Sequence, residues 1–120
     1  EPLDDDTPSK EVLLQVAIAD AQVTTLGAHV MARSFDAVLI DPPVRDVWGL
    51  ETVKSGHQGS ALVEWDYGYP EPYENVPPEK DIDTHEGPRR EEAAQEQLAT
   101  FLETGIVENY CDGPCVSTEE

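Results

Sequence analysis

The chain has 120 residues, and its 26 Asp and Glu against 7 Lys and Arg give a formal net charge of −19. This surplus of acid excludes a basic footprint for direct DNA or RNA binding and opposes contact with anionic membranes. No apolar run reaches the roughly 18–20 residues that span a bilayer, and the length supports one domain with a modest core.

The sequence predicts three parts. Residues 1–10 are expected to form a flexible acidic leader, because consecutive Asp side chains repel one another and nothing there can pack. Residues 11–110 are expected to form a single small α+β domain. Residues 111–120 form a C-terminal tail that carries a pair of cysteines. The fold class that we expect is a short antiparallel sheet with one or two helices and proline-rich loops.

A helix is predicted over residues 8–26, with Thr7-Pro8 as the start signal and Gly27 as the stop signal. Its apolar stripe at helical spacing consists of Val12, Val16, Ala19, Val23, Leu26 and Val30. Apolar residues also alternate over residues 12–18, which indicates strands. We favour the helix because the start and stop signals bracket it, but strands stay an alternative.

A buried strand is predicted over residues 34–41, where the prolines that follow end it. The stretch Phe35–Val44 resembles the strand-end Asp-Pro-Pro motif of adenine-N6 methyltransferases. That resemblance implies that Asp41 and the Pro42 carbonyl would bind a target amino group. Val44 stands where that family has a base-stacking aromatic residue, and the chain contains no glycine-rich loop for S-adenosylmethionine. We therefore interpret the stretch as a strand that meets a proline turn.

Residues 48–87 are expected to form strands and loops. Residues 50–53 and 60–65 are expected to pair as a hairpin, because Gly56 to Gly59 can turn the chain between them. An aromatic segment rich in proline and glycine follows. Its rings bury large area at a small cost in side-chain entropy, which is typical of protein-binding surfaces. The candidate partner-binding residues are Trp65, Tyr67, Tyr69 and Tyr73. A loop that packs these rings over the edge of its own sheet is the competing interpretation.

The clearest helix signal begins at Pro88, and Gly105 is expected to end that helix and leave Ile106-Val107 as a short strand. Acidic residues near its start suit the helix dipole. Its predicted apolar stripe consists of Ala93, Ala94, Leu98, Phe101, Leu102 and Ile106.

Two groups of residues suggest a metal site and a disulfide. Asp81, Asp83, His85 and Glu86 are the densest group of potential cation ligands, and the three acids are the predicted ligands, although their spacing departs from the EF-hand pattern. A solvated turn is the competing interpretation of these acids. Cys111 and Cys115 enclose an Asp-Gly-Pro turn that can bring the thiols together, so a structural disulfide is predicted.

The function that we expect is a non-enzymatic structural or interaction protein that acts through protein–protein contacts. Acids spread over the whole chain and scarce Lys are typical of proteins from concentrated salt, so a halophilic source is predicted. A virion head or tail accessory component is the most concrete form of this hypothesis. Its partners would be other protein subunits and the cations of the surrounding salt, with no cofactor and no membrane insertion.

Two other functions stay open. One is an acidic inhibitor that mimics nucleic-acid phosphates and occupies a basic partner, and the other is a small metal-binding protein. The sequence shows no nucleophile elbow or other catalytic motif, so we predict that the protein is not an enzyme. A disulfide between the two cysteines is typical of exported or particle-surface proteins, so we expect a particle-associated or extracellular location over the cytoplasm.

Overall fold

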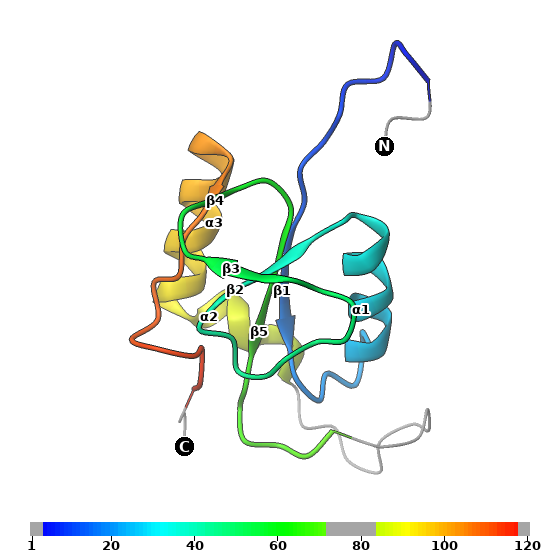
Figure 1. Cartoon of the computed structure of the whole chain (residues 1–120). Coiled ribbons are helices and arrows are strands. Elements are labelled where there is room, and N and C mark those ends of the chain that lie inside the picture. The colour runs from blue at the N-terminus through cyan, green and yellow to red at the C-terminus, as the bar shows by residue number, and fades with distance from the viewer. Residues whose placement is uncertain (1–3, 72–83, 118–120) are drawn as a thin grey trace.

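The computed structural model describes residues 4–71 and 84–117, which form a mixed α/β domain (Figure 1). Its helices and strands in chain order are β1 Leu13–Ala17, α1 Thr25–Ser34, β2 Val38–Asp41, β3 Thr52–Lys54, β4 His57–Gln58, β5 Ala61–Trp65, the 3₁₀ turn η1 Thr84–Glu86, α2 Gly87–Arg90, α3 Glu92–Thr104 and β6 Ile106–Val107. Among these residues, no helix is long and apolar enough to cross a bilayer.

The main sheet is parallel, in the order β1-β5-β2-β3. The expectation of an antiparallel sheet is therefore wrong for these four strands and holds only for the small pair β4–β6, where His57 lies opposite Val107. Parallel strands need connections that return along the sheet, and α1 is the return from β1 to β2.

Both faces of the main sheet are covered, because α1 lies on one side and α3 on the other (Figure 1). The odd-numbered residues of β5 pack in one cluster with Ala94 of α3. On the opposite face, Leu62 packs with Ala32 of α1, and Glu64 reaches His29 of the same helix. This period of two, buried on each face, is typical of parallel sheets between helices.

The predicted helix over residues 8–26 is wrong. The strand β1 occupies Leu13–Ala17, and α1 begins only at Thr25, with the Thr24 side chain accepting a hydrogen bond from the Gly27 amide at 3.2 Å. Gly27 lies inside the first turns of α1 instead of ending a helix. A strand buried on both faces is a nearly continuous apolar run, which periodicity cannot distinguish from a helix.

The predicted strand over residues 34–41 is confirmed for its second half, which is β2. Ser34 instead ends α1, and Asp36 turns the chain with a positive φ of 52°. Asp41 is the last residue of β2 and the prolines follow it, as the interpretation of a strand meeting a proline turn requires.

The predicted hairpin between residues 50–53 and 60–65 is wrong, since β3 and β5 both pair with β2 in parallel and lie on either side of it. The glycines between them do turn the chain, with φ of 90° at Gly56 and 133° at Gly59. Between these turns, β4 pairs with β6 and not with a neighbour in sequence.

The predicted C-terminal helix from Pro88 is only partly confirmed, because Glu91 is extended (φ −75°, ψ 124°) and divides it into α2 and α3, whereas the predicted short strand is confirmed as β6. Gly105 adopts the left-handed conformation with φ of 72°, and its amide donates to the Phe101 carbonyl at 2.8 Å. The apolar stripe is only partly correct, because Ala94 is buried while Leu98 and Leu102 are exposed. The neighbouring buried position holds a polar residue, Gln97.

Candidate functional site

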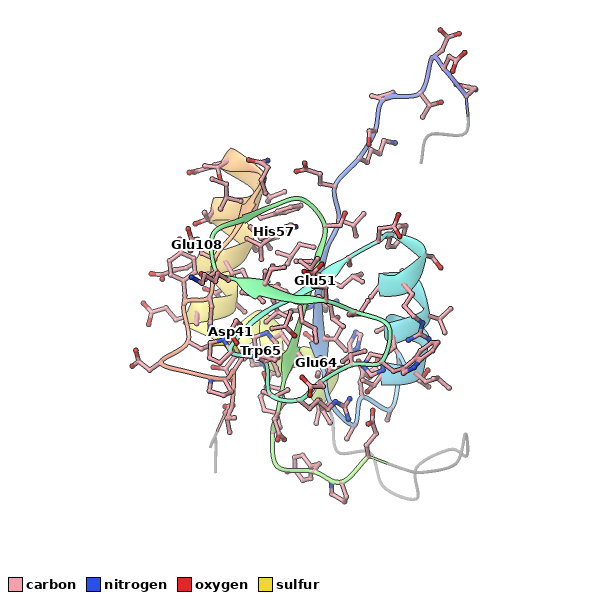
Figure 2. The ribbon with its side chains drawn as sticks, in the orientation of Figure 1. Asp41, Glu51, His57, Glu64, Trp65 and Glu108 are labelled. Carbon is pink, nitrogen blue, oxygen red and sulfur yellow. A yellow bond between two sulfur atoms is a disulfide. The ribbon has the colours of Figure 1, made fainter. Side chains whose placement is uncertain are left out.

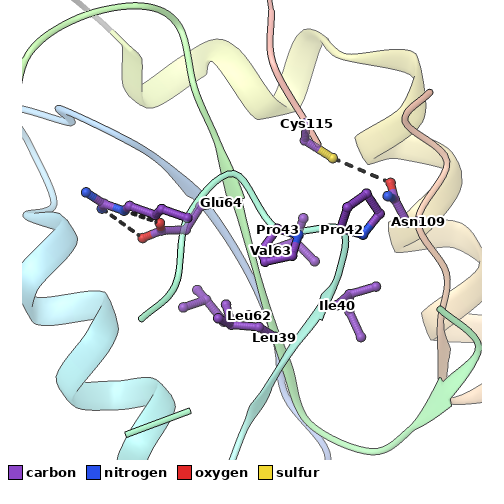
Figure 3. A pocket seen from close by; sticks show the side chains of 10 residues that line it. Leu39, Ile40, Pro42, Pro43, Leu62, Val63, Glu64, Asn109 and Cys115 are labelled. Carbon is purple, nitrogen blue, oxygen red and sulfur yellow. Dashed lines mark hydrogen bonds and ion pairs between the residues drawn. The ribbon is translucent and has the colours of Figure 1, made fainter. Parts of the chain in front are cut away.

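A group of charged side chains gathers at the edge of the sheet where the parallel strands end. Glu64, near the end of β5, is buried, and its carboxylate contacts Nε2 of His29 from α1. The guanidinium of Arg45, from the loop after β2, donates to Glu64 Oε2 at 2.7 Å, a contact dashed in Figure 3, and to Glu71 at 2.6 Å; Figure 2 labels Glu64 on β5. The group therefore joins α1, this loop and the segment after β5 to the sheet.

The charges of this group stabilise one another. Burial opposes the charged form of Glu64, but hydrogen bonds from His29 and Arg45 outweigh it and hold the pKa of Glu64 below its usual value. Burial also opposes the charge of Glu71, whose pKa is lowered by its hydrogen bond from Arg45. The hydrogen bond to Glu64 raises the pKa of Arg45, so the guanidinium stays charged. These groups are engaged with each other, which suits a structural ion pair better than a catalytic acid or base.

Acid is expected to destabilise the fold through these carboxyl groups. A carboxyl whose pKa is lower in the folded chain than the usual 4.5 stabilises the fold above that value and loses this contribution as the pH falls through the folded pKa. The free energy of unfolding, measured by denaturant titration with circular dichroism in concentrated salt, should therefore fall below about pH 4.5. The titration is done in concentrated salt because salt screens the repulsion among the many carboxylates of the chain. Protonation of those carboxylates would otherwise relieve this repulsion and mask the loss. Glu71→Gln should reduce this loss, and an unchanged pH profile would contradict the assignment.

A second pair of charged groups fixes the chain that precedes α2. His85 Nδ1 lies 2.7 Å from Asp20 Oδ2, and Asp20 Oδ1 also accepts hydrogen bonds from the amides of Gln22 and Val23. Asp20 thus anchors the turn after β1 to η1. Its oxygens are occupied by these contacts, so the pair is a structural tether.

The predicted cation ligands are only partly visible. Asp81 and Asp83 lie outside the described residues, and Glu86 accepts a hydrogen bond from Arg89 at 2.7 Å. Within residues 4–71 and 84–117, no group of three or more His, Cys, Asp or Glu is arranged to hold a metal ion.

The predicted aromatic surface does not hold for Trp65, which is 3% exposed and packs in the core under α3. Tyr67 is partly buried against the same cluster, and a Cβ atom at Gly87 would lie 2.3 Å from its ring, so this glycine allows the close approach. Tyr69 is exposed, and Tyr73 lies outside the described residues. Trp65 and Tyr67 therefore serve packing in the isolated chain.

The two cysteines are joined in a disulfide, with Cα atoms 5.4 Å apart. Cys115 is buried in the core cluster under α3. Asn109 holds the enclosed turn, since its side chain accepts from the Cys111 amide at 2.8 Å and donates to the Gly113 carbonyl at 3.0 Å. The bridge thus fixes the C-terminal segment against the sheet.

A small recess lies between this segment and the ends of the strands (Figure 3). Its lining residues are Leu39, Ile40, Pro42, Pro43, Arg45, Leu62, Val63, Glu64, Asn109 and Cys115. The space is about the size of one water molecule, and its charged lining residues are already paired with each other. The prolines of the Asp-Pro-Pro stretch therefore lie beside a packed corner, without room for a nucleobase.

The outer face of α1 and the residues next to it gather several of the large apolar side chains that the described residues expose. The helix buries its small side chains, Thr25, Ala28 and Ala32, against the sheet. Large apolar side chains point outward instead, and we call the following set the α1 face: Val23 52%, Leu26 62%, Val30 51%, Met31 46%, Phe35 42% and, from the adjoining loop, Trp48 84% exposed.

Trp48 is fixed to α1 by Arg33. The guanidinium carbon lies 5.4 Å from the centroid of the indole ring, and Arg33 donates to the Trp48 carbonyl at 3.2 Å. A Cβ atom at Gly49 would lie 2.8 Å from the Arg33 side chain, so this corner is closely packed. The most exposed ring of the set is thus held beside the helix.

Sequence reasoning missed the α1 face and placed Val23, Leu26 and Val30 in a buried stripe. Two signals in the sequence could have revealed it. Small residues recur at the spacing i, i+3 and i+7 over Thr25, Ala28 and Ala32, which marks a close approach to a sheet. Residues 21–35 also contain no Asp or Glu, although more than a fifth of the chain is acidic.

The chain matches no protein-family model, no curated protein and no solved structure. Any statement about its function therefore depends on its own residues.

Proposed function

We propose that this protein is a non-enzymatic interaction protein that joins an assembly through the α1 face. The observation that carries this proposal is the inverted pattern of α1, which buries its alanines and exposes Leu26, Val30 and Met31. Surface helices of globular proteins normally turn their large apolar side chains toward the core. A contiguous apolar patch on a soluble chain marks a contact surface for another protein.

The patch contains residues suited to strong binding. Trp48 is 84% exposed, and Trp is enriched among the residues that dominate binding energy at interfaces. Because Arg33 already holds the ring, its burial would cost little further side-chain entropy. Complete burial of a large aliphatic side chain such as Leu26 contributes about 1.5–3 kcal/mol.

Gly27 supports the same proposal. It lies on the outward side of α1, between Leu26 and Val30, and only the Thr24 hydroxyl would lie close to an added Cβ. Glycine inside a helix costs about 0.5–1 kcal/mol relative to alanine. A neighbouring chain that packs closely against the helix would offset that cost, because glycine lets two backbones approach.

The charge distribution supports a contact made in concentrated salt. The net charge of −19 would drive copies and acidic partners apart in dilute buffer, whereas salt shortens the range of this repulsion to about 3 Å at 1 M. Residues 21–35 are free of acids, so the helical part of the α1 face adds no charge of its own to this repulsion. We therefore propose a halophilic source and an assembly role, of which a virion head or tail accessory protein is one form.

Photo-crosslinking from the α1 face tests the proposal. A photoreactive amino acid at Val30 should give one discrete adduct in source-cell extract at high salt, because this side chain is half exposed at the centre of the patch. The same amino acid at Asp112, exposed in the C-terminal turn, is the control and should not give that adduct. Failure to form an adduct at Val30, or equal adducts at both positions, would overturn the proposal.

A further inference from the structure

A second apolar face lies on α3, on the opposite side of the sheet from α1 (Figure 1). Leu98 and Leu102 are one helical turn apart and are 42% and 73% exposed. Glu92, Glu96 and Glu103 are also exposed and share a second line of the same helix, about a third of a turn around its axis from the leucines. We call these five residues the α3 face.

The two faces are complementary in charge. Residues 21–35, which make up most of the α1 face, contain no acid, and Arg33 lies in the last turn of the helix. The α3 face carries three carboxylates on its other flank, about a third of a turn from its leucines. Apolar residues can therefore meet apolar residues while Arg33 meets a carboxylate, and opposite charges at an interface fix orientation and exclude wrong partners.

We propose that the partner of the α1 face is the α3 face of a second copy of this chain. This inference rests on the proposed function of the α1 face. Within one copy the sheet separates the two faces, so they can meet only between copies. Such a contact joins two different surfaces, and each further copy can add in the same way. The result is a ring or a filament, depending on the rotation between neighbours.

The two symmetric alternatives fit the surfaces less well. A contact between two α3 faces would bring six carboxylates together, because each face contributes Glu92, Glu96 and Glu103. A contact between two α1 faces would leave both copies of Leu98 and Leu102 exposed and would give Arg33 no carboxylate of the α3 face. The head-to-tail contact covers both apolar faces and pairs their charges.

Sedimentation velocity of the purified chain across a salt series tests this inference. Wild type should be monomeric in dilute buffer and should form species larger than a dimer in concentrated salt, because screening removes repulsion between copies of charge −19. Leu26→Glu and Leu102→Glu should each weaken association more than about tenfold, since each places a charge in a buried contact. Both substituted positions are exposed in the single chain, so folding should be unaffected.

Mixing the two variants separates the possible geometries. The Leu26→Glu chain keeps its α3 face and the Leu102→Glu chain keeps its α1 face, so an equimolar mixture should form dimers and nothing larger. Val116→Glu is the matched control, because Val116 is 56% exposed and lies outside both helices, and it should associate like wild type. The inference would be overturned if wild type stayed monomeric at every salt concentration. It would also be overturned if the Leu102→Glu chain formed dimers without the Leu26→Glu chain present.

The crosslinking experiment distinguishes failure of this inference from failure of the proposed function. An adduct from Val30 with twice the mass of the chain supports both. An adduct with a different protein supports the proposed function and overturns the head-to-tail contact.

Discussion

Arg45→Met is expected to lower the free energy of unfolding by about 3–5 kcal/mol, because it leaves a buried carboxylate without its main partner. Glu64 has a side chain that is only 2% exposed and receives two hydrogen bonds from Arg45, at 2.7 and 3.2 Å. Glu71 loses its hydrogen bond from Arg45 as well. Denaturant unfolding at neutral pH, monitored by circular dichroism, measures the effect.

The double variant Arg45→Met/Glu64→Leu is the control for this prediction. Replacing both members of a buried ion pair with apolar residues is often neutral, so the second substitution should recover most of the lost stability. If Arg45→Met costs less than about 1 kcal/mol, the pair behaves like an exposed surface pair and our account of this group is wrong.

Gln97→Ala is expected to cost about 3 kcal/mol, because this buried amide links three parts of the fold. Gln97 Nε2 donates to the Glu108 carbonyl at 2.7 Å. Gln97 Oε1 accepts a hydrogen bond from the side-chain Nε2 of Gln15, in β1, at 3.0 Å. The substitution removes one hydrogen bond from the Glu108 carbonyl and one from the Gln15 side chain, which keeps only its bond to the Ala94 carbonyl at 2.8 Å, and it opens a space in a position that is 1% exposed.

Gln95→Ala on the same helix is the matched control. The Gln95 side chain is exposed and makes one hydrogen bond, to the Arg89 carbonyl at 2.8 Å, so its loss should cost about 1 kcal/mol or less. Thermal and denaturant unfolding of both variants would give the comparison. Equal costs would show that the buried link from β1 through α3 contributes little.

The second half of the fold could be predicted because its signals are local. Pro88 and Gly105 bracket the region of α2 and α3, and each acts through its own backbone restrictions. The disulfide joins cysteines only four positions apart, with a turn sequence between them. None of these features depends on distant residues.

The first half could not be predicted in the same way, because its structure depends on pairing between distant segments. β1 pairs with β5, and Leu13 lies opposite Ala61, far along the chain. Only this pairing makes residues 13–17 a strand, since their apolar run also suits a helix. The polar group at the strand ends likewise joins His29, Arg45 and Glu64 from three segments, and no sequence pattern brings them together.

The candidate site was missed for a related physical reason. Sequence patterns were interpreted with the rule that large apolar residues are buried, so Leu26 and Val30 were assigned to the core. In the fold, α1 packs against β1 and against Leu62 of β5, and small side chains such as Ala28 and Ala32 fill its buried side. The large side chains of the helix are left outside, where a partner can contact them.

Oxidative footprinting of the native assembly tests the central claim about the α1 face most directly. Met31 and Trp48 are exposed in the isolated chain, whereas Trp65 is 3% exposed and serves as an internal reference. Hydroxyl radicals should therefore modify Met31 and Trp48 rapidly in the isolated chain and slowly in the assembly, with Trp65 protected in both. Equal modification of Trp48 in the two states would contradict the claim that the α1 face is a contact surface.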